Sequence, residues 1–139
     1  MEKIENGVIQ FQGYRITDLR YRCADDYVFP DASEVQYRFG LEKSVDRPEK
    51  GLLIVKLRTK VFVGENEETA LRFASVELVG NFKSNMDISP VWETNALAIL
   101  FPYARSIISG ITAQSGFPPV ILPTVNIAKM FKEAEKKDQ

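Results

Sequence analysis

An apolar residue stands at almost every second position of residues 52 to 63, and this pattern constrains the fold most. It is typical of a β-strand with one buried face. The polar segment ENEET follows, and ALRFASVELVGNF then alternates again, so residues 52 to 82 predict a long β-hairpin. The second alternation changes phase between Phe73 and Val76, which indicates a bulge or a strand whose two faces are buried at different places. The inward residues of the first strand are Leu53, Val55, Leu57, Val61 and Val63.

Two earlier segments also have the period of a strand. In YRITDLRYRCA, Leu19, Tyr21 and Cys23 alternate with Arg20 and Arg22, which predicts a first strand of the same sheet. In EVQYRFGLE, the apolar residues share one face and Gln36, Arg38 and Glu42 the other. The apolar set of this second strand is Val35, Tyr37, Phe39 and Leu41.

Between these two strands lies DDYVFPDAS, a turn-rich crossover that carries Tyr27 and Phe29. Aromatic side chains on a loop either fill a gap in the core or form a binding surface. The residue pattern alone leaves both interpretations open.

Helical spacing begins only after Pro90. The stripe Phe101, Ala104, Ile108 and Ile111 predicts a helix, with Pro102 in its first turn and VWETNALAI as a separate short element. The small residues on this helix permit close approach of a second backbone, either of its own sheet or of another subunit. These candidate interface residues are Ser106, Ser109, Gly110 and Ala113.

A second, short amphipathic helix is expected after Asn126, whose side chain could cap it. Its apolar residues are Ile127, Met130, Phe131 and Ala134. Four strands followed by two helical segments predict an α+β fold, formed by residues 1–139 as one domain. Residues 1–8 and 132–139 are expected to be flexible ends.

Charge and composition argue against several function classes. Basic and acidic residues, 18 and 19 in number, are well mixed, so neither nucleic acid nor an anionic membrane is an expected partner. A single cysteine and the absence of a signal-peptide pattern indicate a cytoplasmic setting, and no apolar run approaches the roughly 20 residues of a membrane span.

Catalytic chemistry is also not indicated. The chain has no histidine, the commonest general base near neutral pH and the commonest metal ligand. Its adjacent carboxylates, Asp25 with Asp26 and Glu67 with Glu68, stand in turn-like segments where burial is not expected to shift a pKa. No phosphate loop, dinucleotide fingerprint or metal-ligand cluster is present in the sequence. We therefore expect a protein that is not an enzyme and uses no cofactor or metal.

The C-terminal third is more specific. The segments ILFPYAR at 99 to 105, GFPPVILPTVN at 116 to 126 and IAKMF at 127 to 131 resemble, in order and spacing, the signature region of SecB-type export chaperones. FQGYRITDLRYRC, EVQYRFGL and ENEETALRFASVELVGNF resemble more loosely the strands of that family. The resemblance covers roughly residues 10 to 135.

This resemblance implies a four-stranded antiparallel sheet with two main helices on one side, assembled as a dimer or a dimer of dimers. It also implies an ATP-independent holdase that binds unfolded or precursor polypeptides in apolar grooves, linked to protein export. Such grooves work by broad apolar burial, worth about 25 cal/mol per Å². The groove residues expected are Tyr27, Phe29, Val35, Tyr37, Phe39, Phe117, Leu122 and Met130.

Family members that dock on the motor SecA use acidic positions on the first and fourth strands. Here Arg20 and Arg22 stand where acid is expected on the first, and the fourth offers Phe73, Ser75 and Glu77. These departures favour, as an alternative, a dedicated chaperone of one partner such as an antitoxin. A small-ligand-binding domain is a lesser alternative.

Overall fold

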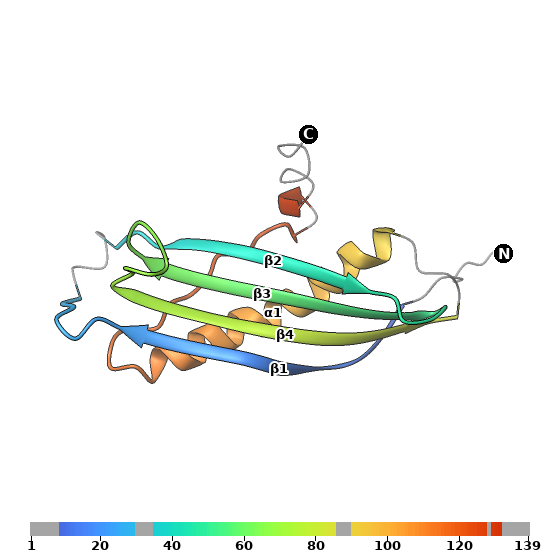
Figure 1. Cartoon of the computed structure of the whole chain (residues 1–139), viewed down its shortest axis with the longest axis horizontal. Helices are drawn as coiled ribbons and strands as arrows, with labels where there is room; N and C mark the ends of the chain where they lie inside the picture. Colours follow the sequence, from blue (N-terminus) through green and yellow to red (C-terminus); the bar gives the residue numbers. More distant parts are fainter. Residues whose placement is uncertain (1–8, 30–34, 86–89, 128, 132–139) are drawn as a thin grey trace.

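Four antiparallel strands form one sheet in the order β1-β4-β3-β2. The structure is a computed structural model, and it describes residues 9–29, 35–85, 90–127 and 129–131. The long helix α1 lies across one face of the sheet (Figure 1). This arrangement confirms the α+β prediction. The elements are β1 (Ile9–Cys23), β2 (Arg38–Asp46), β3 (Leu52–Val63), β4 (Arg72–Ser84) and α1 (Pro90–Ala113).

The predicted hairpin is formed by β3 and β4, with Val55 opposite Gly80 and Leu57 opposite Leu78. Leu53, Val55, Leu57 and Val61 of β3 are buried as expected, because they face α1, whereas Val63 at the end of the strand is half-buried. The β2 pattern is confirmed as well: Phe39 and Leu41 are half-buried, whereas Glu42 is exposed. Strand β2 itself begins only at Arg38, so Val35 and Tyr37 precede it.

The change of phase in β4 comes from burial on both faces. The register of β3 with β4 continues unbroken from Leu52 to Val63, which rules out a bulge between these strands. Phe73 lies on the face turned away from α1, beneath the guanidinium of Arg22, whereas Val76 faces the helix. Register shifts occur instead in β1, between Phe11 and Tyr14 and between Ile16 and Asp18.

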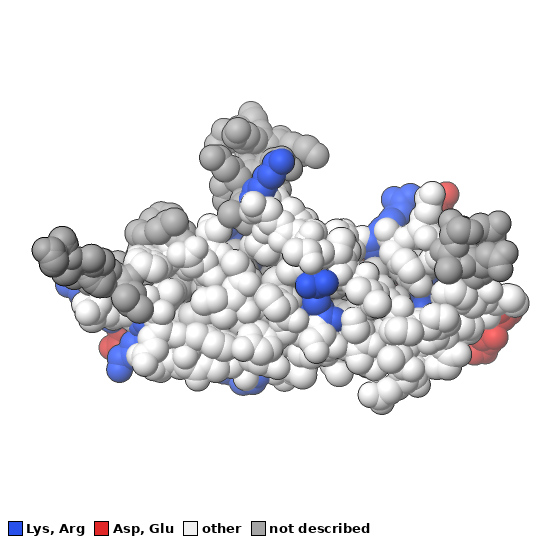
Figure 2. Space-filling model, turned by 180° about the vertical axis from the view of Figure 1, so that it is seen from behind, with Lys and Arg blue, Asp and Glu red and all other residues white. Residues whose placement is uncertain are grey.

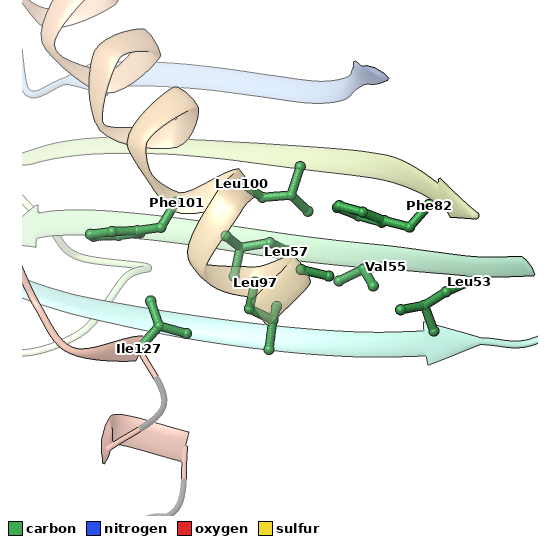
Figure 3. Packing of buried hydrophobic residues seen from close by; sticks show 9 residues of the cluster. Leu53, Val55, Leu57, Phe82, Leu97, Leu100, Phe101 and Ile127 are labelled. Carbon is green, nitrogen blue, oxygen red and sulfur yellow. The ribbon is translucent and has the colours of Figure 1, made fainter. Parts of the chain in front are cut away.

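The core lies between the sheet and α1 (Figure 3). Leu97, Leu100 and Phe101 project from the helix onto β3 and β4, and Ile127 adds a contact from the C-terminal segment. A second buried cluster continues along the helix through Ala104 and Ile108. Burial of each large side chain stabilises the fold by about 1.5 to 3 kcal/mol.

The prediction that Pro102 starts the helix is wrong. α1 begins at Pro90 and runs through Pro102 as a single helix of 24 residues, so VWETNALAI is its first half. A proline inside a helix costs about 3 kcal/mol. Pro102 is exposed, while Phe101 before it and Ala104 after it are both buried on the sheet. Packing on both sides of the proline therefore holds the two halves in one helix.

Because α1 is continuous, Trp92–Ala113 is long and apolar enough to cross a membrane by length and composition alone. The sequence expectation that no such segment exists was therefore too strict. A core helix passes the same test, and α1 buries one side on the sheet.

The C-terminal helix begins as predicted. The Asn126 side chain accepts a hydrogen bond from the Lys129 backbone N–H at 3.0 Å, which is N-cap geometry. Ala134 and both predicted flexible ends fall outside the described residues.

Candidate functional site

The crossover after β1, the β3–β4 turn and the last turn of α1 meet at one end of the molecule (Figure 1). Three aromatic rings predicted for the groove come together there. The Tyr27 and Phe117 centroids are 5.5 Å apart, and Phe29 stacks on Phe117 at 5.9 Å. We call Tyr27, Phe29 and Phe117 the aromatic cluster. Burial raises the pKa of the Tyr27 phenol, with the neighbouring Tyr37 adding to the shift.

The aromatic cluster surrounds the buried side chain of Arg72, which is 2% exposed. Arg72 Nε donates to the Tyr21 hydroxyl at 3.1 Å, and Nη1 donates to the Tyr37 hydroxyl at 3.0 Å. Nη2 donates to backbone oxygens of Thr112 and Pro118 and to the Ser115 hydroxyl. All these acceptors are neutral. Through these hydrogen bonds, the Arg72 guanidinium connects β1, the segment before β2, the end of α1 and the segment after α1.

A surface hollow of about 350 Å³ lies beside the aromatic cluster. Two apolar side chains in its wall are open to solvent, Val28 at 80% exposure and Leu71 at 43%. Exposed apolar area beside half-buried rings is suited to contact with apolar side chains of another chain. The lining residues are Asp26, Tyr27, Val28, Val35, Gln36, Val63 and Leu71.

Of the other predicted groove residues, Val35 lines this hollow and the rest lie elsewhere. Tyr37 reaches the aromatic cluster through Arg72, and Phe39 packs, half-buried, on the core beneath α1. Leu122 is 3% exposed and belongs to that core. Met130 is half-buried on the C-terminal helical turn, away from the aromatic cluster. The structure therefore brings together only part of the predicted set.

Sequence reasoning missed Arg72, Val28 and Leu71. For Arg72 a signal exists, because it falls in phase with Ala74 and Val76 on the buried side of β4. A charged residue at an inward position indicates a specific partner. The exposure of Val28 and Leu71 depends on how distant segments meet, which alternation does not encode.

The residues considered for motor docking, Phe73, Ser75 and Glu77, share the face of β4 turned away from α1. Phe73 and Ser75 are 7% and 1% exposed. Glu77 accepts hydrogen bonds from Thr17 at 2.7 Å and from Arg58 at 2.8 Å. These bonds, the one from Thr17 foremost, lower the pKa of the Glu77 carboxyl below its usual 4.5. The one acid of this trio is thus already engaged.

The proposed interface residues on α1 face outward. Ser106, Gly110 and Ala113 are exposed, while the Ser109 hydroxyl donates to the Val120 carbonyl. Figure 2 shows this side of the molecule: uncharged atoms cover most of it, and Lys and Arg form only isolated spots. The exposed apolar residues continue from α1 onto β1. They are Tyr103 on α1 and Tyr14, Ile16 and Leu19 on β1.

Within the described ranges, no group of three His, Cys, Asp or Glu side chains is placed to hold a metal ion. The surface hollows are lined by mixtures of apolar, polar and charged side chains. The arrangement suits binding of polypeptide.

Comparison with known proteins agrees with this geometry. The family model described as preprotein translocase subunit SecB matches residues 8–138. The chain belongs to the SecB family. SecB-family members are chaperones, and the fold described above is that of a chaperone of this family.

Individual relatives support the assignment. An uncharacterized protein of Methanocaldococcus jannaschii is 29% identical, over 98% of this chain and 90% of its own. The protein-export protein SecB of Caulobacter vibrioides is 30% identical, over 78% of this chain and 68% of its own. The SecB-like chaperone of Mycobacterium tuberculosis, solved with a ChAD peptide from the HigA1 antitoxin, superposes with a TM-score of 0.66. That structure is 18% identical, covers 84% of this chain and 90% of its own, and supports the fold.

Proposed function

We propose that this SecB-family protein is an ATP-independent holdase that binds unfolded polypeptide at the aromatic cluster and the adjoining hollow. The observation that carries the proposal is the juxtaposition of exposed Val28 and Leu71 with the rings of Tyr27, Phe29 and Phe117. Unfolded chains expose apolar side chains in many sequences, so broad apolar burial binds them without sequence-specific hydrogen bonds. Export precursors in the cytoplasm are the expected clients, and no enzymatic step is required.

An aggregation assay tests this proposal. An excess of the protein should suppress light scattering by a denatured model substrate diluted into buffer. Val28→Ser with Leu71→Ser should weaken the suppression, because both side chains are exposed and their loss removes apolar contact area without opening the core. Ile121→Ser is the matched control, since Ile121 is 72% exposed and lies outside the hollow. Unimpeded aggregation with the wild-type protein would contradict holdase activity.

We also propose that the uncharged helix-side surface meets a second copy of the chain, giving a dimer or a dimer of dimers. The exposed rings of Tyr103 and Tyr14 are tilted against each other with centroids 4.6 Å apart, which connects the apolar surface of α1 with that of β1. The small exposed residues Ser106, Gly110 and Ala113 would allow two helices to approach closely. Sedimentation equilibrium tests this: a species of monomer mass at all concentrations would contradict it.

The dedicated-chaperone alternative is favoured by two observations. The Mycobacterium tuberculosis neighbour was solved with an antitoxin peptide, and the docking acids implied by the resemblance are replaced here by Arg20, Arg22 and Ser75. Affinity capture from the native cell separates the two roles. A broad set of unfolded clients supports general holding, whereas a single dominant client supports the dedicated role.

A further inference from the structure

On the face of the sheet turned away from α1, strand β4 runs between two rows of cations. Val79 has Arg15 of β1 on one side and Lys56 of β3 on the other. Ser75 is flanked in the same way by Arg20 and Lys60. The cations of these rows are Arg15, Arg20 and Arg22 on β1 and Lys56, Arg58 and Lys60 on β3.

The carboxylates between the rows are already paired. Asp18 contacts Arg20 at 2.9 Å and Arg58 at 3.4 Å, and Glu77 contacts Arg58 at 2.8 Å. Arg15 and Lys56 have no ion pair within 4 Å among the described residues, although the charge of Lys56 acts on the nearby Glu77 carboxylate. Val79 therefore lies between two cations without an ion pair, and Arg22, which contacts the Glu67 carbonyl and the Phe73 ring, is a third on this face.

Arg15 and Lys56 stand at the rim of a hollow of about 360 Å³. Its base is apolar, because the almost fully buried Val79 lies between the two cations and Ile54 lies next to Lys56 along β3. Thr17, Ser44, Val45, Asp46 and Glu77 complete the lining. A smaller hollow, lined in part by Lys56 and Arg58, continues toward β2. The site thus combines two available cations with an apolar patch.

We propose that this hollow docks an acidic segment of a partner protein, with carboxylates on Arg15 and Lys56 and an apolar side chain over Ile54 and Val79. Arginine and lysine bind carboxylates through charge-assisted hydrogen bonds, and complementary charge sets the partner and speeds association. A nucleic acid fits less well, because Asp46 and Glu77 in the same lining interrupt the positive charge that a continuous run of phosphates requires, whereas an acidic segment can place separate carboxylates on Arg15 and Lys56 and an apolar side chain between them. The site goes beyond client holding, since it lies on the opposite face of the sheet from α1.

A binding measurement tests the proposal. The probe is a short fluorescein-labelled peptide of Glu and Gly around one Leu, too poor in apolar residues to be a holdase client. Its fluorescence anisotropy should rise with the wild-type protein at low salt and fall as salt is added. Arg15→Gln with Lys56→Gln should weaken the dissociation constant about tenfold, since two charged contacts are lost. A peptide with Lys in place of Glu should not bind.

Lys129→Glu is the matched control, because it changes the net charge by the same amount at an exposed site on the C-terminal turn. It should leave peptide affinity unchanged. Equal affinity of the wild type and the double variant, or no binding to the wild type at low salt, would overturn the proposal. So would a single-stranded oligonucleotide that binds instead of the peptide and weakens in the double variant. Aggregation suppression should be intact in that variant, which separates this proposal from holdase activity.

Discussion

Arg72 donates a hydrogen bond from Nη1 to the hydroxyl of Tyr37 at 3.0 Å, across 35 residues of sequence. Through this bond the buried end of β4 holds the segment that leads from the crossover into β2. The same guanidinium holds Thr112 and Pro118 at the end of α1. The position of the aromatic cluster relative to the sheet therefore depends on one residue.

Replacing Arg72 should destabilise the whole domain. Arg72→Met leaves two phenol groups and two backbone carbonyls without their donor, and each such group that stays buried without a partner costs about 1 to 3 kcal/mol. Urea denaturation measures the free energy of unfolding. Arg20→Met is the control, since that side chain is 67% exposed and should matter by about 1 kcal/mol or less. Equal loss in both variants would refute the role given to Arg72.

Gly80 marks the closest approach of α1 to the sheet. A Cβ at this position would stand 2.7 Å from Leu100 Cδ2, and Leu100 is fully buried. Gly80→Ala should therefore lower the free energy of unfolding by about 1 to 3 kcal/mol. The cost should shrink when Leu100→Val is also present, which a double-mutant cycle measures. Strict additivity of the two changes would show that the contact is absent.

The protein should lose stability in acid, because protonation of Glu77 removes a stabilising contribution. Its pKa is lowered in the folded state, so its ionised form contributes stability that is present above pH 4.5 and lost as pH falls through the lowered value. Glu77→Gln should reduce stability at neutral pH, and the gap to wild type should narrow toward about pH 3. In an NMR titration, Thr17→Val should raise the pKa of Glu77 again, because the hydrogen bond from the Thr17 hydroxyl is the largest cause of the lowered pKa. A stability difference between Glu77→Gln and the wild type that stays constant from neutral pH to acid would contradict the role given to Glu77.

Substitutions at Gly110 test whether α1 takes part in self-association of the protein. A Cβ at Gly110 meets nothing within 4 Å in the single chain, so Gly110→Ala should stabilise the monomer by about 1 kcal/mol through helix propensity. The same methyl group should weaken self-association if two α1 helices meet there, and Gly110→Leu should weaken it further. Sedimentation velocity reports the association state. Unaltered association in both variants would place the interface elsewhere.

Most of the sheet could be predicted from the sequence, because apolar and polar residues alternate in β3 and β2, as they must in a strand with one buried face. The burial of Phe73 on the far face of β4 was not, since it depends on Arg22 from another strand. The continuity of α1 through Pro102 was missed for a related reason. A local rule assigns the proline to a helix start, whereas packing of Phe101 and Ala104 on the sheet outweighs its cost.

The candidate site was only partly predictable. Tyr27, Phe29 and Phe117 were chosen for their residue type in loops and the family resemblance, and the structure places them together. Leu122 has the same apolar character, but its place in the core follows from the path of the segment after α1. Membership in a surface cluster depends on tertiary contacts, which residue type alone does not determine.

The affinity for a permanently unfolded polypeptide, such as a reduced and carboxymethylated protein, tests the central claim most directly. Calorimetry should show binding with a negative heat-capacity change, as expected when apolar surface is buried. Val28→Ser with Leu71→Ser should weaken that binding by about fivefold or more, since each lost apolar contact is worth about 1 kcal/mol. Ile121→Ser should leave it unchanged. Absence of binding to the wild type, or equal affinity in the double variant, would contradict the account.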